Sequence, residues 1–437
     1  MSHTLSSMKI LVIGSGGREH VLCYALRKTA KRPVQLYCAP GNDGIDAIAQ
    51  CVPLRAIDVP ALAQFAETEK IDLTIVGGEA PLAAGLADEF ERRGLAVAGP
   101  RAAAARLESS KVFAKDFMAR HHIPTARFRV ASSVSEAREI LLRGEFGADD
   151  SGVVIKADGL AAGKGVVVAA TRREALDAVA DLMEGGRVGG NAAQRIVLEE
   201  ALAGPEVSLL LWTDGTDYVL MPPARDHKRV GENDTGPNTG GMGAITAPDL
   251  LDEATHARIV REVVEPTLAG LRADQLKFRG IIFIGLMLTP EGARVLEYNV
   301  RFGDPEAQAI LVRLESDLSE IFAALAHGKL AGVPVSWSND ASACVVLAAP
   351  GYPERPQTGA RIEGLDSASQ MPGMQLFHAG TKRAPDGSWR VAGGRVLGVT
   401  SRAATLERAL DNCYETIPRL HWKGLHYRRD IGRFRQP

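Results

Sequence analysis

Short apolar runs alternate with amphipathic stretches along the first hundred residues of the chain. Residues 9–14, 34–39 and 71–76 are apolar enough to be buried strands, and residues 18–27 have the pattern of a helix. Strands that alternate with helices form doubly wound parallel sheets, which bind ligands at the carboxyl ends of their strands. The pattern therefore predicts an N-terminal parallel sheet with a ligand at that edge.

The rest of the chain predicts more strands than helices. A helix is expected over residues 102–120, and residues 234–243 predict a long glycine-rich loop, which in a compact domain usually has a function. After residue 334 the pattern predicts a small α/β domain, in which Lys382 and Arg395 are candidate substrate contacts. Strands are expected at 153–158, 166–170, 195–200, 207–212, 283–289, 294–300 and 342–348, and near Gln375 and Arg395.

The stretch 295–306 carries the most distinctive polar groups. In a strand, side chains two positions apart share a face, so Glu297, Asn299 and Arg301 lie on one face and Leu296 on the other. Carboxylate and amide oxygens suit Mg²⁺, and a guanidinium can bind a carboxylate or phosphate through two hydrogen bonds. This face predicts a phosphoryl-transfer site, although an ordinary sheet with one solvated face has the same alternation.

The segment Asp304-Pro305-Glu306 has the composition of a helix start. An Asp N-cap, a Pro at the first helical position and an acid near the positive end of the helix dipole would open a helix over 307–314. Capping is the interpretation that we favour for Asp304, and contact with a substrate is the alternative.

Composition and charge narrow the classes of function. The 437 residues include 51 Lys and Arg against 53 Asp and Glu, and a net charge of −2 is not typical of a binder of nucleic acid or anionic membranes. Neither a bilayer-length apolar run nor a signal-peptide core is present. The five cysteines lack CxxC pairs and metal-ligand spacing, which is typical of reduced residues in a cytoplasmic protein.

The loop Gly14-Ser-Gly-Gly17 joins the first strand to the first helix. Its backbone N–H groups and the helix N-terminus predict an anion site. In a dinucleotide fingerprint the third glycine would fall at Glu19, and the second strand ends at Ala39 without the acid that holds a ribose. The loop therefore suits one phosphate better than a pyrophosphate. Arg18 could add charge there, although a polar first helical turn explains it equally well.

Three further stretches predict contacts to a nucleotide or a substrate. Residues 159–165 lack the Ser or Thr and the following helix of a P-loop, so a hairpin flap over phosphates is expected, with charge from Lys156 and Lys164. The strand, hinge and strand around residue 203 offer backbone groups to an adenine edge and Glu206 to ribose hydroxyls. The basic residues of 226–229 predict a substrate contact, as does Glu79 at a strand end.

Six motifs together resemble one enzyme family. The chain from about Met8 onwards is similar to the phosphoribosylamine–glycine ligase (glycinamide ribonucleotide synthetase) family of the ATP-grasp superfamily. One departure is Gly78, where we expect proline. The motifs are Gly-Ser-Gly-Gly-Arg-Glu-His at 14–20, Val-Gly-Gly-Glu-Ala-Pro-Leu at 76–82, Ile-Lys-Ala-Asp-Gly-Leu-Ala-Ala-Gly-Lys-Gly-Val at 155–166, Asp-His-Lys-Arg at 226–229, Asp-Thr-Gly-Pro-Asn-Thr-Gly-Gly-Met-Gly-Ala at 234–244 and Arg-Phe-Gly-Asp-Pro-Glu at 301–306.

The resemblance implies an α/β fold with three domains. These are an N-terminal Rossmann-like (pre-ATP-grasp) domain at 8–108, an ATP-grasp domain at 109–330 with a mobile lid at about 125–195, and a small barrel-like α/β domain at 335–437. It also implies a cytoplasmic enzyme of de novo purine biosynthesis that joins glycine to 5-phospho-β-D-ribosylamine through glycyl phosphate. ATP and Mg²⁺ or Mn²⁺ are expected, and no nucleic-acid or membrane partner. The expected assembly is a monomer or weak homodimer.

The resemblance also implies roles for individual residues. Glu297 and Asn299 match the family's metal ligands, and Arg301 and Lys156 are the expected catalytic residues. Many ATP-grasp enzymes have a further metal carboxylate on the preceding strand, where this chain has Gly285. The expected nucleotide-binding residues are Lys111, Lys156, Gly163, Lys164, Gly165, Glu199, Leu202 and Glu206. The expected substrate residues are Gly16, Gly17, Arg18, Glu19, Glu79, Asp226, Lys228, Arg301 and Asp304.

Three other functions compete with this one. Another ATP-grasp enzyme, such as a biotin carboxylase-like enzyme acting on bicarbonate, is opposed by the phosphate loop at 16–18 and by residues 226–229. A nucleotide-binding regulatory module without catalysis is opposed by the presence of Glu297, Asn299, Lys156 and Arg301. A dinucleotide oxidoreductase is opposed by Glu19, which stands where the fingerprint has its third glycine, and by Ala39, which ends the second strand without the expected acid.

Overall fold

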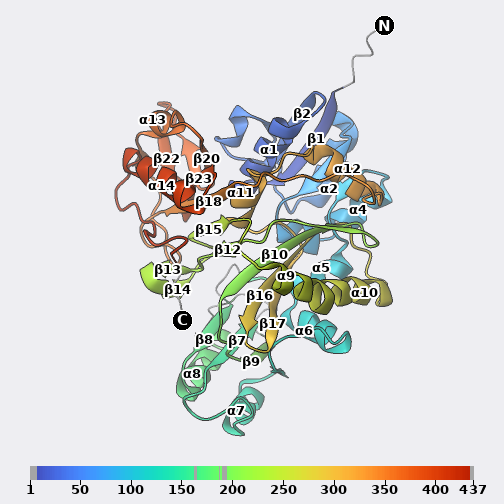
Figure 1. Ribbon diagram of the computed structural model, residues 1–437, viewed down its shortest axis with the longest axis vertical. Helices are drawn as coiled ribbons and strands as arrows, with labels where there is room; N and C mark the ends of the chain where they lie inside the picture. The colour runs from blue at the N-terminus through green and yellow to red at the C-terminus, as the bar shows by residue number, and fades with distance from the viewer. Residues whose placement is uncertain (1–6, 162–164, 187, 189–193, 434–437) are drawn as a thin grey trace.

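The computed structural model describes residues 7–161, 165–186, 188 and 194–433, and the protein is a mixed α/β fold (Figure 1). Its N-terminal part is a five-stranded parallel sheet in the order β3-β2-β1-β4-β5, as the sequence pattern predicts. The strands are β1 (Met8–Gly14), β2 (Val34–Pro40), β3 (Gln50–Cys51), β4 (Leu73–Val76) and β5 (Val97–Ala98), and the helices are α1 (Gly17–Thr29), α2 (Val59–Glu69), α3 (Glu79–Ala83) and α4 (Leu86–Arg92).

The central part contains two four-stranded antiparallel sheets. The first forms the lobe at the bottom of Figure 1, in the order β6-β9-β7-β8, and the second crosses the middle in the order β11-β10-β16-β17. The lobe comprises β6 (Phe128–Ala131), α7 (Val134–Leu142), β7 (Val153–Ala157), β8 (Val166–Ala169), α8 (Arg172–Met183) and β9 (Ile196–Glu200). The second sheet comprises β10 (Glu206–Thr213), β11 (Tyr218–Leu220), β16 (Gly280–Thr289) and β17 (Gly292–Asn299), beside α9 (Glu253–Ile259), the π-helical turn Val260–Val264 and α10 (Glu265–Ala273).

The third region builds its main sheet from two parts of the chain. Its order is β12-β15-β18-β23-β20, so two strands from the central segment continue a sheet of C-terminal strands, on which α14 packs. A second small sheet has the order β19-β22-β21. The elements are β12 (Arg225–Asp226), β15 (Gly243–Thr246), β18 (Ala341–Ala348), β19 (Arg361–Ile362), α13 (Leu365–Ser369), β20 (Met374–His378), β21 (Thr381–Arg383), β22 (Trp389–Val391), β23 (Arg395–Ala403) and α14 (Leu406–Thr416).

The predicted helix over 102–120 is wrong in its middle. Two helices occupy the stretch, α5 (Ala102–Ser109) and α6 (Lys111–Arg120), and Ser110 between them is extended, with φ −136° and ψ 114°. The Ser110 hydroxyl accepts a hydrogen bond from the Phe113 amide at 3.1 Å and donates one to Asp158 at 2.8 Å. A serine that caps the second helix therefore ends the first.

The predicted glycine-rich loop at 234–243 is also partly regular. Its first residues form β14 (Thr235–Asn238), which pairs antiparallel with β13 (Arg229–Gly231). Gly236 has φ +77°, a backbone conformation that suits glycine, and the Thr235 hydroxyl donates to the Glu232 carbonyl at 2.8 Å. These local contacts turn the loop into a short hairpin.

The expected capping role of Asp304 is wrong. The helix α11 (Glu306–Leu311) begins two residues later, with Pro305 at its N-cap, and no side chain caps it. The Asp304 carboxylate instead accepts a hydrogen bond from Gln308 Nε2 at 2.7 Å and pairs with Arg395. One side chain from the following helix and one distant arginine therefore bind the carboxylate that was expected to cap the helix.

The helices α11 and α12 (Leu318–His327) both pack against α1.

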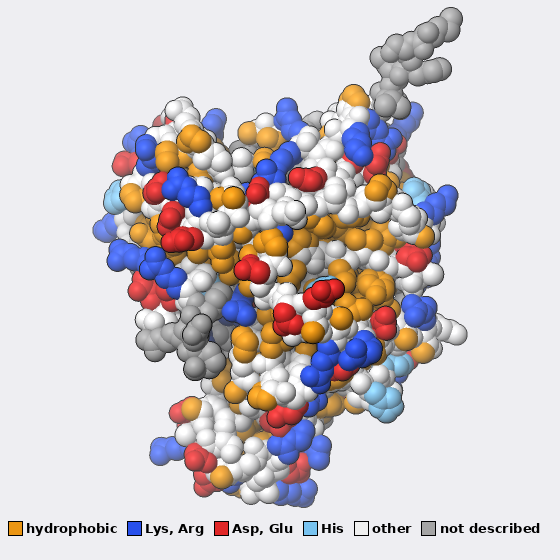
Figure 2. Space-filling view, viewed as in Figure 1, with side chains coloured by type: hydrophobic (Ala, Val, Ile, Leu, Met, Phe, Trp, Pro, Cys, Tyr) orange, Lys and Arg blue, Asp and Glu red, His pale blue; other side chains and the backbone are white. Residues whose placement is uncertain are grey.

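Basic and acidic side chains are intermingled over the face shown in Figure 2, where an apolar band crosses the middle of the molecule. Among the described residues, no helix combines the length and the apolar character that a membrane span requires. All five cysteines are free thiols, as their spacing predicts, and four of them are buried.

Candidate active site

One cavity of about 1290 Å³ gathers most of the residues that the sequence singles out. Its walls come from the lobe sheet, from β10, β16 and β17, and from segments of the N-terminal and C-terminal regions. Gly163 and Lys164 lie outside the described residues. The expected site residues that line the cavity are Arg18, Glu79, Lys111, Lys156, Gly165, Glu199, Leu202, Glu206, Asp226, Lys228, Glu297, Asn299, Arg301 and Asp304.

The end of β17 presents its polar groups to this cavity, with one departure from simple alternation. Gly285 pairs with Glu297 but Leu286 pairs with Val295, so Leu296 is the extra residue of a β-bulge. Leu296 therefore lines the cavity together with Glu297 and Asn299, and its expected place on the opposite face is wrong. Val295 stays in the core.

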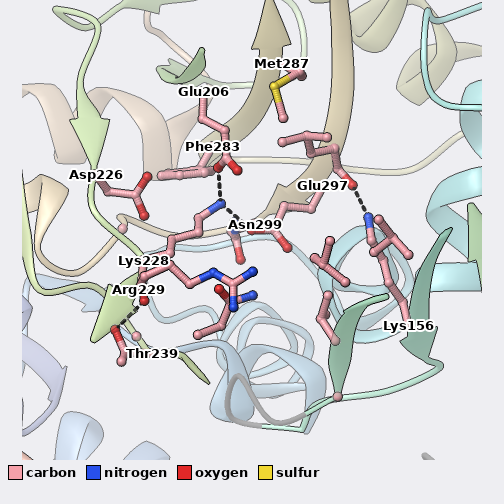
Figure 3. A pocket seen from close by; sticks show the side chains of 18 of the residues that line it. Lys156, Glu206, Asp226, Lys228, Arg229, Thr239, Phe283, Met287, Glu297 and Asn299 are labelled. Carbon is pink, nitrogen blue, oxygen red and sulfur yellow. Dashed lines mark hydrogen bonds and ion pairs between the residues drawn. The ribbon is translucent and has the colours of Figure 1, made fainter. Parts of the chain in front are cut away.

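Glu297 is charged because cations surround it. Burial alone would raise the pKa of its carboxyl, but Lys228, Lys111, Lys156 and Arg301 outweigh that effect and lower the pKa to about 2. The nearest of these, Lys228 Nζ, lies 3.8 Å from Glu297 Oε1. Figure 3 shows Glu297 and Asn299 between Lys156 on one side and Lys228 on the other.

Lys228 pairs with Glu206 as well. Its Nζ donates to Glu206 Oε2 at 2.8 Å, so Glu206, the expected ribose contact, already has a cationic partner. The pKa of Lys228 is raised, since Glu206, Asp226 and Glu297 outweigh the lowering effect of burial. One ammonium group thus interacts favourably with several carboxyl groups.

Asp226 and Glu306 are the acids of this cluster that hold protons most tightly. Burial raises the pKa of Asp226, and Glu306, Glu206 and Glu297 add to that effect while Lys228 opposes it. Burial also raises the pKa of Glu306, whose side chain lies 3.5 Å from the Ser208 hydroxyl. Sequence reasoning treated Glu306 only as a helix-start acid, because its neighbours come from β10 and β12.

Arg301 is held by four groups. Its Nε lies 3.2 Å from Glu79 Oε2, and its Nη2 lies 3.2 Å from Asn299 Oδ1 and 2.7 Å from Glu108 Oε1. Its Nη1 donates to the Phe302 carbonyl at 3.0 Å. Glu108 belongs to none of the sequence motifs, and its spacing in α5 gave no signal that it would meet Arg301.

Lys156 reaches the same cavity from β7. Its Nζ lies 2.9 Å from Glu199 Oε1 and donates to the Leu296 carbonyl at 2.9 Å. The other oxygen of Glu199 lies 2.7 Å from Lys115 Nζ, and burial lowers the pKa of Lys115 to about 8. Glu199, expected at the adenine hinge, therefore bridges two lysines. Lys115 was not singled out in the sequence.

Two backbone amides of the Gly14–Gly17 loop donate hydrogen bonds to the carboxylate of Glu19. Glu19 is 2% exposed, and its Oε2 accepts from the Ser15 and Gly16 amides at 3.1 and 2.5 Å, so these donors face a carboxylate rather than the cavity. Gly16, Gly17 and Glu19 are not among the residues that line the cavity. Arg18 does line it, with Nε 2.7 Å from Glu19 Oε1 and Nη1 3.2 Å from the Phe302 carbonyl.

The C-terminal region contributes Arg395 to the cavity. Its Nη2 lies 2.9 Å from Asp304 Oδ2, and its Nη1 donates to the carbonyls of Gly240 and Asp304. Lys382, the other C-terminal candidate, is exposed on β21 and is not among the lining residues. Arg395 thereby joins the third region to the segment that follows Arg301.

The donors available for a cation are few. Among the described residues, no group of three or more His, Cys, Asp and Glu side chains is arranged to hold a metal ion. Glu297 and Asn299 offer a charged carboxylate and an amide oxygen from alternate positions of one strand. Such hard oxygen donors suit Mg²⁺, which usually takes part of its shell from phosphates and water.

Three segments of the chain match domains of one protein family. Residues 8–108 match the Phosphoribosylglycinamide synthetase N domain, residues 109–307 the ATP-grasp (A) domain, and residues 342–434 the C domain. Curated relatives called phosphoribosylamine–glycine ligase are similar over nearly the whole chain. The protein of Xylella fastidiosa is 45% identical over 429 residues, and that of Brucella melitensis 45% over 427 residues, with 97% of both chains covered in each case.

Solved structures give the same result. The phosphoribosylamine–glycine ligase of Thermotoga maritima is similar with a TM-score of 0.81 and 33% identity, covering 97% of this chain and 100% of that one. A biotin carboxylase of Campylobacter jejuni has a TM-score of 0.69 at 14% identity, covering 96% of this chain and 93% of that one. The second likeness concerns the fold alone.

Proposed function

The chain belongs to the phosphoribosylglycinamide synthetase family and catalyses an ATP-dependent ligation of glycine in purine biosynthesis, and we propose that the cavity described above is where this reaction takes place. The ATP-grasp fold and the ligase activity that the motifs imply are thereby confirmed. The observation that carries the proposal is that Glu297, Asn299 and Arg301 line one cavity with Lys111 and Lys156.

The ATP-grasp fold implies the use of ATP and a divalent metal ion. We propose Mg²⁺ or Mn²⁺ as the ion, held by Glu297 and Asn299. The residues fit this role, because the Glu297 carboxyl has its pKa lowered to about 2 after cations outweigh burial, and so stays charged at neutral pH. When bound, the ion would offset the negative charge of the phosphates.

The nucleotide would lie between the lobe sheet and the central sheet. Lys111 and Lys156 would contact its phosphates, and Leu202 would lie at the adenine hinge, with Gly165 in the flap. Glu206 would accept from ribose hydroxyls through Oε1, because Lys228 pairs with Oε2. Glu199 contributes by holding Lys156, since the two are joined by a 2.9 Å ion pair.

The chemistry is an attack of the glycine carboxylate on the γ-phosphorus of ATP. A carboxylate oxygen bonds to phosphorus as the bond to the β-phosphate oxygen breaks, giving glycyl phosphate and ADP. The amino group of 5-phosphoribosylamine then bonds to the acyl carbon, phosphate leaves and the nitrogen loses a proton, giving the amide. Repulsion between carboxylate and triphosphate is the main obstacle, and Arg301 and Lys156 supply positive charge that offsets it.

The second substrate would bind at the end of the cavity that faces the N-terminal and C-terminal regions. Arg18, Lys228 and Arg301 supply cations there, while Glu79, Asp226 and Asp304 supply acceptors for hydroxyl and amino groups. Gly16, Gly17 and Glu19 would act through Arg18, because Glu19 accepts from Arg18 Nε at 2.7 Å.

Further parts of the proposal concern organisation. We propose domains at 8–108, 109–330 and 335–437, with a lid at about 125–195. The separate N-terminal sheet supports the first boundary and the separate sheet β6-β9-β7-β8 supports the lid, while β12 and β15 of the central segment join the C-terminal sheet. A cytoplasmic location is supported by the five free cysteines. A monomer or weak homodimer is proposed, with small molecules as its substrates.

The substrate dependence of ADP release tests the function. The protein is incubated with ATP and Mg²⁺ plus glycine alone, phosphoribosylamine alone, bicarbonate alone, or glycine and phosphoribosylamine together. Steady ADP release is expected only with the pair, because the acyl phosphate needs the amine to turn over. Release that depends on bicarbonate, or no release under any condition, would contradict the proposed function.

A further inference from the structure

Glu108 is the most completely buried acid in contact with the proposed catalytic arginine. It lies near the end of α5, 3% exposed, and its Oε1 is 2.7 Å from Arg301 Nη2. Its Oε2 accepts a hydrogen bond from the Val300 amide at 2.8 Å. One carboxylate therefore holds both the guanidinium and the backbone at the end of β17.

The Glu108 carboxylate needs the positive charge of Arg301 because it is buried. Burial raises the pKa of the Glu108 carboxyl, the charge of Arg301 opposes this, and nearby Glu79 raises it further. A buried carboxylate without a cationic partner is costly, and removing one member of a buried pair is strongly destabilising. The two residues thus support each other in an environment that water hardly reaches.

The other edge of the guanidinium is more open. Glu79 meets Arg301 Nε at 3.2 Å, and the Glu79 side chain is 35% exposed against 4% for Glu108. Both Nη atoms are occupied by Asn299, Glu108 and the Phe302 carbonyl. An anion that enters the cavity could therefore replace the more exposed Glu79 at the Nε edge, whereas Glu108, which also lines the cavity, is nearly fully buried against the Nη2 edge.

We propose that Glu108 is a positioning residue, which holds the Nη2 edge of Arg301 so that the Nε edge, now facing Glu79, meets the anionic group of the reacting substrate. The inference rests on the role proposed for Arg301 in phosphoryl transfer. Two charge-assisted contacts from one buried acid fix the direction of the guanidinium, and small errors in that direction are costly in catalysis.

A double-mutant cycle tests whether Glu108 acts through Arg301. The variants are Glu108→Gln, Arg301→Ala and the double variant, measured as kcat for ADP release with glycine and phosphoribosylamine both saturating. Glu108→Gln should lower kcat by about 10- to 100-fold in the parent, with the KM for ATP nearly unchanged. The same change in the Arg301→Ala background should alter kcat by less than about twofold.

Folding must be separated from positioning. Glu91→Gln is the matched control. Glu91 lies on α4 and pairs with Lys277 and with Arg101, the residue just before the start of α5, and it does not line the cavity. Glu91→Gln should leave kcat unchanged. Thermal unfolding of both variants measures how much stability each one loses, so that an effect on kcat can be told from an effect on folding. If Glu108→Gln does not fold, Glu108→Asp, which keeps the charge with a shorter reach, takes its place in the cycle.

The outcomes distinguish this inference from the proposed function. An equal fold-loss from Glu108→Gln with and without Arg301 would overturn the inference, because it would show a purely structural role. An unchanged kcat in Glu108→Gln would overturn it as well. Unchanged kinetics in Arg301→Ala alone would instead contradict the role of Arg301, and with it the proposed site.

Discussion

The ammonium group of Lys156 lies 2.9 Å from Glu199 Oε1, and neither side chain is more than 8% exposed. Lys115 shares the same carboxylate at 2.7 Å, so one buried acid holds two buried lysines. A lysine at a phosphate site needs a fixed direction, and its flexible stem does not supply one. Glu199 and the Leu296 carbonyl supply it here.

Replacing Glu199 should therefore affect both stability and nucleotide binding. Glu199→Gln leaves Lys115 and Lys156 without their shared anion, which we expect to lower the free energy of unfolding by about 3 kcal/mol. The KM for ATP should rise about tenfold, because Lys156 loses its anchor. Glu139→Gln removes an exposed pair with Arg143 on the same lobe and should cost under about 1 kcal/mol. Equal stabilities and equal KM values would contradict this account.

Arg395 makes the C-terminal region part of the active site. Arg395→Ala removes the 2.9 Å pair with Asp304 and the contact with the Gly240 carbonyl, so the segment after Arg301 loses a support. We expect kcat/KM for phosphoribosylamine to fall about 10- to 100-fold. Lys382→Ala, on exposed β21, should leave it unchanged. An Arg395→Ala enzyme with parental kinetics would show that the pair with Asp304 is not needed.

Gly77 is required because Glu19 occupies the space beside it. A Cβ at Gly77 would lie 2.2 Å from Glu19 Oε1, and that carboxylate cannot move freely because it accepts from the Gly16 amide and from Arg18. Gly77→Ala should lower the free energy of unfolding by about 1–3 kcal/mol. At the neighbouring Gly78 a Cβ meets Arg18 at 3.4 Å, an ordinary contact, so Gly78→Ala is the control. Chemical denaturation of both variants decides the matter, and equal midpoints would refute the argument.

Asp226 should make stability depend on pH. Burial raises its pKa above the usual range, so its contribution to stability is complete below the unfolded pKa of about 4 and is lost as the pH rises towards the folded pKa. Asp226→Asn removes this titration. The variant should lose less unfolding free energy than the parent between about pH 5 and about pH 8 in urea denaturation. Parallel pH profiles would show that Asp226 is charged in the folded protein.

The alternation at the end of β17 and just beyond it was readable in the sequence, and it correctly predicted that Glu297, Asn299 and Arg301 would face the same side, where all three line the cavity. Periodicity could not predict the bulge at Leu296, because a bulge depends on the register with β16. Local rules also favoured a cap at Asp304, whereas Arg395, 91 positions away, pairs with it instead. Helix-capping propensities take account only of residues nearby in the sequence, so they could not predict the pair between Asp304 and Arg395.

The buried partners of the site were beyond sequence reasoning for the same reason. Glu108 meets the Val300 amide across 192 positions, and Lys115 on the helix α6 meets Glu199 on the strand β9. The sequence pattern around a single acidic residue in a helix does not predict which strand its side chain will contact. The Gly14–Gly17 loop gave the right local structure, yet the carboxylate that fills its amides comes from Glu19 on the following helix.

The fate of a glycine carboxylate oxygen tests the central claim most directly. Glycine labelled with ¹⁸O in its carboxylate is incubated with ATP, phosphoribosylamine and the protein, and the inorganic phosphate is examined by mass spectrometry. Attack of that carboxylate on the γ-phosphorus predicts one labelled oxygen in each phosphate released, and the same reaction of unlabelled glycine in ¹⁸O water predicts none. Phosphate without label from labelled glycine would contradict transfer of the phosphoryl group to glycine.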